Sequence, residues 1–169
     1  MKALLIVDIQ NDFLPGGSLP IPEGERIIPV VNALIEAFDH VIASKDWHPP
    51  GHCSFAIWPQ HCVQHSFGAE FPQALHQEKI KKVFFKGSEK KREGYSAFAK
   101  ESGLTSYLQE QGIDELFVVG LATDYCVKET VLDGLQRHLK ISVVKEGCRA
   151  AHDQIGALAK MKEAGASII

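Results

Sequence analysis

The sequence has no long hydrophobic run, no strong net charge and no low-complexity segment. Its first apolar run, residues 3–7, ends at Asp8, which is too early for a membrane-spanning helix or the core of a signal peptide. Eighteen basic against 21 acidic side chains give a net charge of −3, which disfavours nucleic-acid and membrane-surface binders. We therefore expect a cytoplasmic protein that binds a small molecule, and the formation of a homo-oligomer stays open.

Cysteine is scarce, and the glycine-rich motifs of nucleotide-binding loops are absent. Four cysteines in 169 residues do not indicate a disulfide framework, because a chain of this length can bury a core without cross-links. No G-x-G-x-x-G or P-loop motif follows an apolar run, which argues against a dinucleotide or nucleoside triphosphate site. The thiols are therefore expected to be free, with reactivity and metal binding both open.

What the sequence does contain is an alternation of short apolar runs and segments with helical spacing. The apolar runs are residues 4–7, 41–43, 83–85, 116–119, 141–144 and 167–169. Apolar side chains recur at helical spacing in residues 31–38, 127–135 and 155–159, the last after a cap at Asp153. Continuous runs of Val, Ile, Leu and Phe are typical of parallel strands buried on both faces. The pattern predicts the α/β class, with a single three-layer α/β/α domain over residues 1–169 and a mainly parallel sheet.

Reactive side chains follow the predicted strands, at the edge where ligands bind in parallel sheets. Asp8, Lys86 and Cys126 each stand at or just beyond the end of an apolar run. We expect Thr123 or Asp124 to cap the next helix, so that the Cys126 thiol lies in its first turn, where the thiolate is favoured. Asp8 is then the available general base, and Lys86 is the countercharge. A structural Asp8–Lys86 ion pair with an inert, buried Cys126 is the alternative.

Residues 46–78 are rich in proline, glycine and histidine and predict a long ordered loop of functional importance. Five of the eight histidines lie between residues 48 and 76. The predicted metal ligands are one carboxylate and three imidazoles, namely Asp46, His48, His52 and His61. Such oxygen and nitrogen donors suit zinc, iron or manganese. The alternative is a structural zinc bound by Cys53, Cys62 and two histidines.

Several segments of the chain match a known family. They are spread along nearly the whole sequence: 7–13 (VDIQNDF), 46–49 (DWHP), 58–63 (WPQHCV), 85–87 (FKG), 95–98 (YSAF) and 119–127 (VGLATDYCV). In these segments the sequence resembles the nicotinamidases, which also hydrolyse pyrazinamide, within the isochorismatase-like cysteine hydrolase superfamily. The strand-end Asp, Lys and Cys mark the superfamily, and the D-x-H and W-P-x-H-C elements are more specific for its metal-containing nicotinamidases.

The resemblance implies a catalytic triad of Asp8, Lys86 and Cys126. It also implies an oxyanion hole made by the backbone N–H groups of Ala122 and Cys126, with a cis peptide bond between Leu121 and Ala122. An enzyme of this kind converts nicotinamide to nicotinate and ammonia through a thioester on the cysteine, a step of NAD salvage. On this basis we expect Lys86→Met to keep the fold and to lose catalysis.

For the cofactor, the resemblance implies one divalent metal ion, zinc first, with iron or manganese as alternatives. The implied ligands are the predicted set, Asp46, His48, His52 and His61, with Cys62 beside the metal and not bound to it. Phe13, Trp58 and Tyr95 would enclose the substrate's pyridine ring, whose nitrogen would reach the metal. The segment from His52 to His61 is shorter than in many relatives, which bears on pocket width and substrate range.

Two alternatives stay open on the sequence alone. A related cysteine amidohydrolase of the same superfamily would act on a carbamoyl or ureido substrate. A non-catalytic metal-binding α/β module would use Asp8, Lys86 and Cys126 as a structural cluster, and Cys126 would then show ordinary thiol reactivity. Isochorismate cleavage is disfavoured, because relatives with that chemistry lack the nucleophilic thiol.

Overall fold

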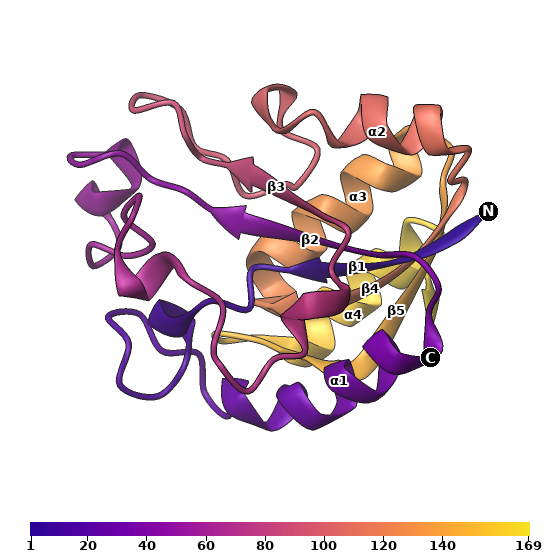
Figure 1. Cartoon of the computed structure of the whole chain (residues 1–169), viewed down its shortest axis with the longest axis horizontal. Coiled ribbons are helices and arrows are strands. Elements are labelled where there is room, and N and C mark those ends of the chain that lie inside the picture. The colour runs from indigo at the N-terminus through magenta and orange to yellow at the C-terminus, as the bar shows by residue number, and fades with distance from the viewer.

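The computed structural model describes residues 1–169, and one six-stranded sheet forms its centre (Figure 1). The strands are β1 (Lys2–Val7), β2 (Val41–Asp46), β3 (Lys82–Lys86), β4 (Glu115–Leu121), β5 (Lys140–Arg149) and β6 (Ser167–Ile168). They lie in the order β3-β2-β1-β4-β5-β6, and every pair is parallel. The predicted α/β class and all six predicted strands are confirmed.

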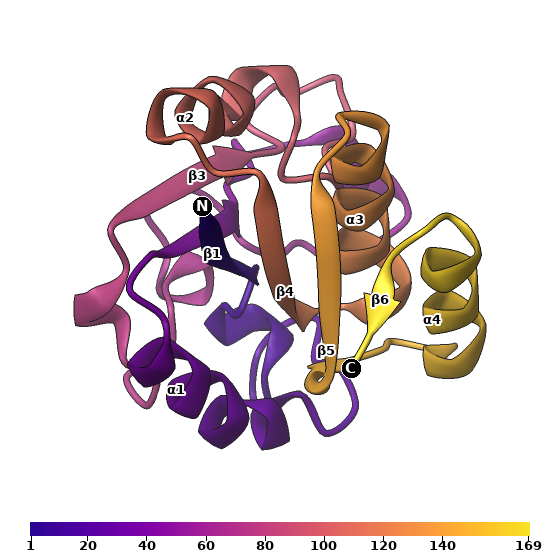
Figure 2. The same cartoon turned by 90° about the vertical axis from the view of Figure 1, so that its right-hand side faces the viewer.

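Helices cover both faces of the sheet (Figure 2). They are α1 (Ile28–Ala37), α2 (Leu104–Gln111), α3 (Lys128–Gln136) and α4 (Gln154–Glu163). Helix α1 packs on one face together with parts of the loops before it and after β2, while α2, α3 and α4 pack on the other. This arrangement forms the three layers that the sequence predicts.

The strand β1 shows why its sequence is apolar without alternation. Ala3, Leu5 and Val7 belong to the core under α2, α3 and α4, whereas Leu4 and Ile6 belong to the core under α1. Successive side chains of a strand point to opposite faces, so a strand covered on both sides needs apolar residues at every position. Each fully buried Leu, Ile or Val side chain contributes about 1.5–3 kcal/mol of hydrophobic stabilisation.

Two helical details differ from the prediction. Helix α2 is not predicted, because only Leu104 and Leu108 of its eight residues are buried, which leaves too few apolar positions for a clear period. In α4 the predicted apolar stripe is wrong at Ile155, whose exposed fraction is 84%; the buried residues are Ala157 and Met161. The predicted cap of α4 is confirmed, because the Asp153 carboxylate accepts a hydrogen bond from the Gly156 N–H at 2.8 Å.

The segment between β2 and β3 is a long ordered connection, as its composition predicts. It contains three single-turn helices, Cys53–Ala56, Phe67–Ala69 and Gln77–Lys79, and no strand. Several of its side chains are buried, among them His48, His61 and Cys62. A loop that buries polar side chains in this way must satisfy them internally, which indicates a site and not a simple linker.

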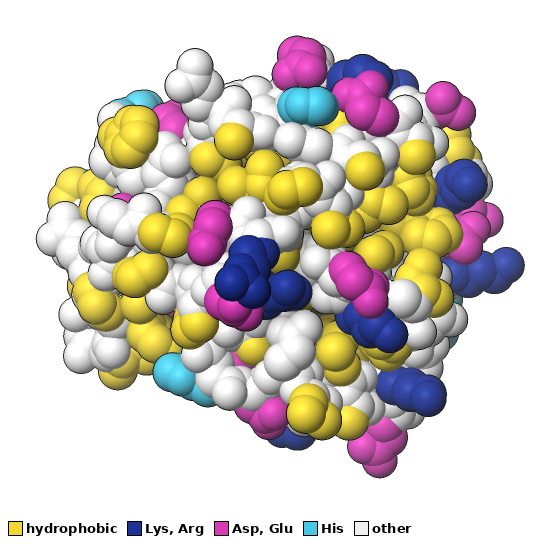
Figure 3. Space-filling model, turned by 90° about the horizontal axis from the view of Figure 1, so that it is seen from below, with side chains coloured by type: hydrophobic (Ala, Val, Ile, Leu, Met, Phe, Trp, Pro, Cys, Tyr) yellow, Lys and Arg dark blue, Asp and Glu magenta, His cyan; other side chains and the backbone are white.

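On the face seen in Figure 3, basic and acidic side chains are interspersed with apolar ones, and no large region carries a single sign of charge. None of the helices is long and apolar enough to span a membrane.

Candidate active site

The carboxyl ends of β1, β2 and β3 bring charged side chains together in the interior. Asp8 follows β1, and Asp46 is the register partner of Lys86 at the ends of β2 and β3. The fully buried Lys86 ammonium lies 2.8 Å from Asp8 Oδ2 and 2.5 Å from Asp46 Oδ1. It also donates hydrogen bonds to the Gly94 carbonyl at 3.0 Å and to Cys126 Sγ at 3.4 Å. The predicted trio of Asp8, Lys86 and Cys126 therefore meets at one point, with Asp46 as a fourth member.

Burial and mutual attraction set the protonation of this cluster. Burial alone would lower the pKa of Lys86, but Asp46 and Asp8 hold it well above its ordinary value. Burial would raise the pKa of Asp46, but Lys86 and His48 hold it below its ordinary value. Burial raises the pKa of Asp8, and the attraction of Lys86 only partly offsets this. The cluster thus combines an ammonium and an ionised Asp46 with an Asp8 whose environment favours proton uptake.

The surroundings of the Cys126 thiol favour its protonated form. Burial raises its pKa well above the ordinary value, and the nearby Asp46 and Asp8 act in the same direction against Lys86. The expectation that the place in the first turn lowers the pKa of this thiol was wrong, because the thiol is also buried and faces two carboxylates. Ligating atoms of Asp8, Asp46 and Cys126 all lie within 4.8 Å of one another.

The backbone that carries Cys126 begins where β4 ends. Gly120 has φ +131°, and a Cβ there would lie 2.0 Å from the Val7 carbonyl oxygen, so only glycine fits beside β1. The Leu121–Ala122 peptide bond is cis, as the resemblance implies. The next residues, Thr123–Val127, form one π-helical turn that contains Cys126 and leads into α3. Such turns occur frequently at functional sites.

The expected helix cap is absent from this turn. No side chain caps it, so the prediction for Thr123 or Asp124 was wrong. Asp124 instead accepts hydrogen bonds from the backbone N–H groups of Ala151, His152 and Asp153, at 2.8, 2.8 and 3.0 Å. Burial would raise the pKa of Asp124, but these three hydrogen bonds lower it. Asp124 thereby fixes the segment before α4 against the turn that carries the thiol.

A second group of donors lies on the other side of Asp46. Ligating atoms of Asp46, His48 and His61 all lie within 4.8 Å of one another, and all three side chains are buried. Asp46 Oδ2 is 3.5 Å from His48 Nε2 and 3.8 Å from His61 Nε2. His48 Nδ1 and His61 Nδ1 are hydrogen bonded to the Gly87 and Pro59 carbonyls, which leaves each Nε2 directed at the carboxylate. Imidazoles fixed through one nitrogen and presented through the other are typical of metal ligands, so this group fits a divalent metal.

His52, the fourth residue of the predicted ligand set, lies outside that group. Its ring stacks on His48 with the centroids 4.1 Å apart. Its Nδ1 is hydrogen bonded with Ser54 Oγ at 2.7 Å, and its Nε2 is hydrogen bonded with the Arg92 carbonyl at 2.9 Å. Both ring nitrogens therefore have protein partners.

The two cysteines of the alternative zinc site do not gather with the histidines. Cys62 is fully buried, and Cys53 Sγ lies 3.8 Å from Glu93 Oε1. Neither thiol belongs to a group of potential ligands within bonding reach of one ion. The structure therefore gives no support to a Cys53–Cys62 zinc site.

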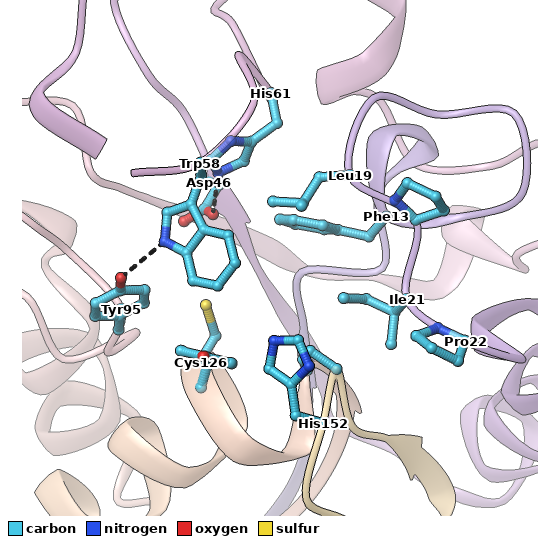
Figure 4. Close-up of a pocket in the computed structure, with 14 residues that line it drawn as sticks. Phe13, Leu19, Ile21, Pro22, Asp46, Trp58, His61, Tyr95, Cys126 and His152 are labelled. Atoms are coloured by element: carbon cyan, nitrogen blue, oxygen red, sulfur yellow. Dashed lines mark hydrogen bonds and ion pairs between the residues drawn. The ribbon is translucent and has the colours of Figure 1, made fainter. Parts of the chain in front are cut away.

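A largely apolar cavity of about 240 Å³ connects the Cys126 thiol with Asp46 and His61 (Figure 4). All three predicted aromatic residues, Phe13, Trp58 and Tyr95, line it, and Trp58 Nε1 donates a hydrogen bond to the Tyr95 hydroxyl at 3.1 Å. Figure 4 shows the Trp58 and Phe13 rings on opposite sides of the cavity, with the thiol directed into it.

Half of the cavity lining is not predicted from the sequence. The additional residues are Leu19, Pro20, Ile21, Pro22, Tyr125, Ala151 and His152. Those at 19–22 come from the loop after β1, and those at 151–152 come from the segment that Asp124 holds. Most of them contribute shape and apolar surface, which leaves no chemical pattern in the sequence.

Two buried polar residues that support the site were also missed. Gln10 donates from Nε2 to the Asp46 and Ala69 carbonyls at 2.8 and 2.9 Å and accepts the Asp46 N–H at 2.9 Å. Ser44 Oγ donates a hydrogen bond to Asp8 Oδ1 at 2.7 Å. A signal was present for Ser44, because a serine two residues before Asp46 faces the same side of β2 as that carboxylate.

Comparison with known proteins shows which family the chain resembles. Residues 2–169 match the isochorismatase domain. The chain is 43% identical to the nicotinamidase of Escherichia coli K12, over 99% of this chain and 93% of that protein. The pyrazinamidase of Pyrococcus horikoshii in complex with zinc is 38% identical, with a TM-score of 0.92 over 99% of this chain and 98% of the other. PnC1 from L. infantum in complex with nicotinate is 35% identical, with a TM-score of 0.95 over 100% and 92%. The chain therefore belongs to the isochorismatase family.

Proposed function

We propose that this protein is a nicotinamidase that hydrolyses nicotinamide to nicotinate and ammonia, and pyrazinamide to pyrazinoate. The observation that carries the proposal is the fully buried Lys86, which joins Asp8, Asp46 and Cys126 at the wall of an aromatic-lined cavity. A structural ion pair at a sheet edge needs neither a thiol nor a cavity. The similarity to the E. coli nicotinamidase and to PnC1 with nicotinate supports the same assignment.

The roles proposed for the trio follow from its contacts. Asp8 takes the Cys126 proton, and the thiolate attacks the carboxamide carbon to form a carbon–sulfur bond. The backbone N–H groups of Ala122 and Cys126 stabilise the oxyanion. Asp8 then returns the proton to the nitrogen as the carbon–nitrogen bond breaks and ammonia leaves. A water molecule then gives a proton to Asp8 while its oxygen bonds to the thioester carbon; the carbon–sulfur bond breaks, nicotinate is released, and Asp8 returns its proton to the sulfur. Lys86 stays charged throughout and holds both carboxylates in place.

The proposed metal site consists of Asp46, His48 and His61, with zinc expected first and iron or manganese as alternatives. A divalent metal bound there would supply a Lewis acid at one end of the cavity, suited to orienting a ring nitrogen. Phe13 and Trp58 would flank the ring, and Tyr95 would fix Trp58 through its hydroxyl. In this assignment residues 46–78 provide the metal ligands of a single domain over residues 1–169.

The direct test is ammonia release from nicotinamide, pyrazinamide and benzamide by the metal-loaded protein. Cys126→Ala should abolish turnover, whereas Cys148→Ala, which removes a buried thiol that does not line the cavity, should leave it nearly unchanged. Benzamide lacks the ring nitrogen and should be a much poorer substrate. Mass spectrometry of enzyme quenched during turnover should find the acyl adduct on Cys126.

Two results would contradict the proposal. Native turnover by Cys126→Ala would exclude the nucleophile, and equal specificity constants for benzamide and nicotinamide would exclude recognition of the ring nitrogen. Activity of metal-free protein on a carbamoyl or ureido amide, with none on nicotinamide, would favour the related amidohydrolase instead.

A further inference from the structure

The Asp8 carboxylate has two chemically distinct oxygens in this structure. Oδ1 accepts a hydrogen bond from Ser44 Oγ at 2.7 Å, and both side chains are fully buried. Oδ2 lies 2.8 Å from the Lys86 ammonium but accepts no hydrogen bond. A buried carboxylate oxygen without a hydrogen bond is unusual, and it calls for an explanation in terms of function.

The hydrogen bonds that Lys86 donates explain why Asp8 Oδ2 has no hydrogen-bond partner. An ammonium has three N–H donors. Those of Lys86 are directed at Asp46 Oδ1, the Gly94 carbonyl and Cys126 Sγ, at 2.5, 3.0 and 3.4 Å. Lys86 therefore stabilises Asp8 mainly by its charge, since its three best-aligned hydrogen bonds go to other acceptors. A carboxylate oxygen of Asp8 lies within 4.8 Å of Cys126 Sγ, and because Oδ1 already accepts from Ser44, Oδ2 is the oxygen left to accept a proton.

Ser44 is placed for this task by the sheet itself. Ser44 is the register partner of Val7 at the end of β1, and its carbonyl accepts the Asp8 backbone N–H at 3.2 Å. Asp8 has φ +50°, so the chain turns sharply where β1 ends. The same serine thus holds Asp8 through backbone and side chain, and the hydroxyl bond fixes the rotation of the carboxylate.

We propose that Ser44 is a positioning residue that orients Asp8 so that Oδ2 is the atom that exchanges the proton with Cys126. The inference rests on the proposed function. In the step concerned the sulfur–hydrogen bond of Cys126 breaks and an oxygen–hydrogen bond forms at Asp8 Oδ2, with no other group changing its protonation. Without the hydroxyl, Oδ1 loses its partner and the carboxylate can rotate, so that Oδ2 is no longer held towards the sulfur.

Ser44→Thr and Ser44→Val provide a matched test, because their side chains have nearly the same shape and differ in the hydroxyl. Ser44→Thr should keep kcat near the native value. Ser44→Val should lower kcat about tenfold or more and leave KM within about twofold, since misplacement of a catalytic group affects the chemical step. Single-turnover quenching should show the same loss in the rate of thioester formation. Melting temperature and metal content are measured for each variant.

Three outcomes would overturn the inference: native kcat in Ser44→Val, equal losses in Thr and Val variants that remain folded, or a loss confined to KM. If the added methyl group prevents folding of both, Ser44→Ala decides in the same way, and native kcat there overturns the inference. The proposed function is judged separately on the wild type. If the wild type prefers another amide, the variants are compared on that amide, because the proton transfer is the same for any carboxamide.

Discussion

Lys86→Met should cost both stability and catalysis, although the sequence alone predicts that the fold survives. The substitution keeps most of the side-chain volume and removes a fully buried charge that lies within 2.8 Å of two carboxylates. Breaking a buried ion pair by removal of one partner typically costs about 3–5 kcal/mol, because the remaining charge has no compensation. Since a domain is stable by only about 5–15 kcal/mol, we expect a large loss in the free energy of unfolding.

The loss should depend on pH in a defined direction. In the native protein Lys86 holds the pKa of Asp46 below its ordinary value, so this carboxylate contributes stability above that value and loses it as the pH falls. Without the ammonium, burial raises the pKa of Asp8 and Asp46 above their unfolded values. The ionised pair then destabilises the variant at neutral pH, and protonation relieves the penalty. The difference between native protein and variant should therefore be largest near pH 7 and shrink towards pH 4.

Denaturant unfolding of chelator-treated proteins between pH 4 and pH 8 measures this difference. Lys45→Met is the matched control, because Lys45 also lies in the sheet with only 8% of its side chain exposed, but its partner Glu70 is 52% exposed. Glu70 can be hydrated once Lys45 is replaced, so the control should lose much less stability than Lys86→Met and show little pH dependence. Equal unfolding free energies for Lys86→Met and the native protein at pH 7, or a difference that does not change with pH, would refute the reasoning.

Two further variants test contacts outside the trio. Asp124→Asn should destabilise the protein by about 1–3 kcal/mol and raise KM, because it weakens three hydrogen bonds that hold Ala151 and His152 at the cavity; an unchanged melting temperature and KM would exclude that role. His52→Ala should leave metal content nearly native, because both ring nitrogens of His52 already have protein partners, whereas His61→Ala should lose the metal; elemental analysis distinguishes this from the four-ligand set.

Most of the fold can be predicted from the sequence, because strands that are buried on both faces of a parallel sheet appear as continuous apolar runs. A strand such as β1 must be apolar at every position, and the polar residue that follows it marks the edge where the strand ends. Asp8, Lys86 and Cys126 could be identified in this way before their contacts were known. The aromatic residues Trp58 and Tyr95 could not, since aromatic residues in loops are usually simple packing; the resemblance to a family indicated their role.

What the sequence could not predict depends on distances across the sheet. The bond from Ser44 to Asp8 requires the register between β1 and β2, and nothing local to either strand encodes that register. The direction in which the pKa of Cys126 shifts depends on the balance between burial, two carboxylates and one ammonium, and not on the position near a helix start alone. Asp124 was predicted to cap the helix that follows it in the sequence. It instead accepts hydrogen bonds from the backbone before α4, a contact that the local sequence does not reveal.

Asp46 belongs both to the charged cluster around Lys86 and to the group of potential metal ligands with His48 and His61. Its Oδ1 accepts a hydrogen bond from Lys86 at 2.5 Å, while its Oδ2 faces His48 and His61 at 3.5 and 3.8 Å. Gln10 holds the Asp46 backbone through both its N–H and its carbonyl, which fixes the point from which the carboxylate extends. A cation bound by the histidines would draw on the same negative charge that keeps Lys86 ionised. The proposed nucleophile and the proposed metal site are therefore coupled through one buried side chain, a geometry suited to holding the two ends of a small aromatic amide at a fixed separation.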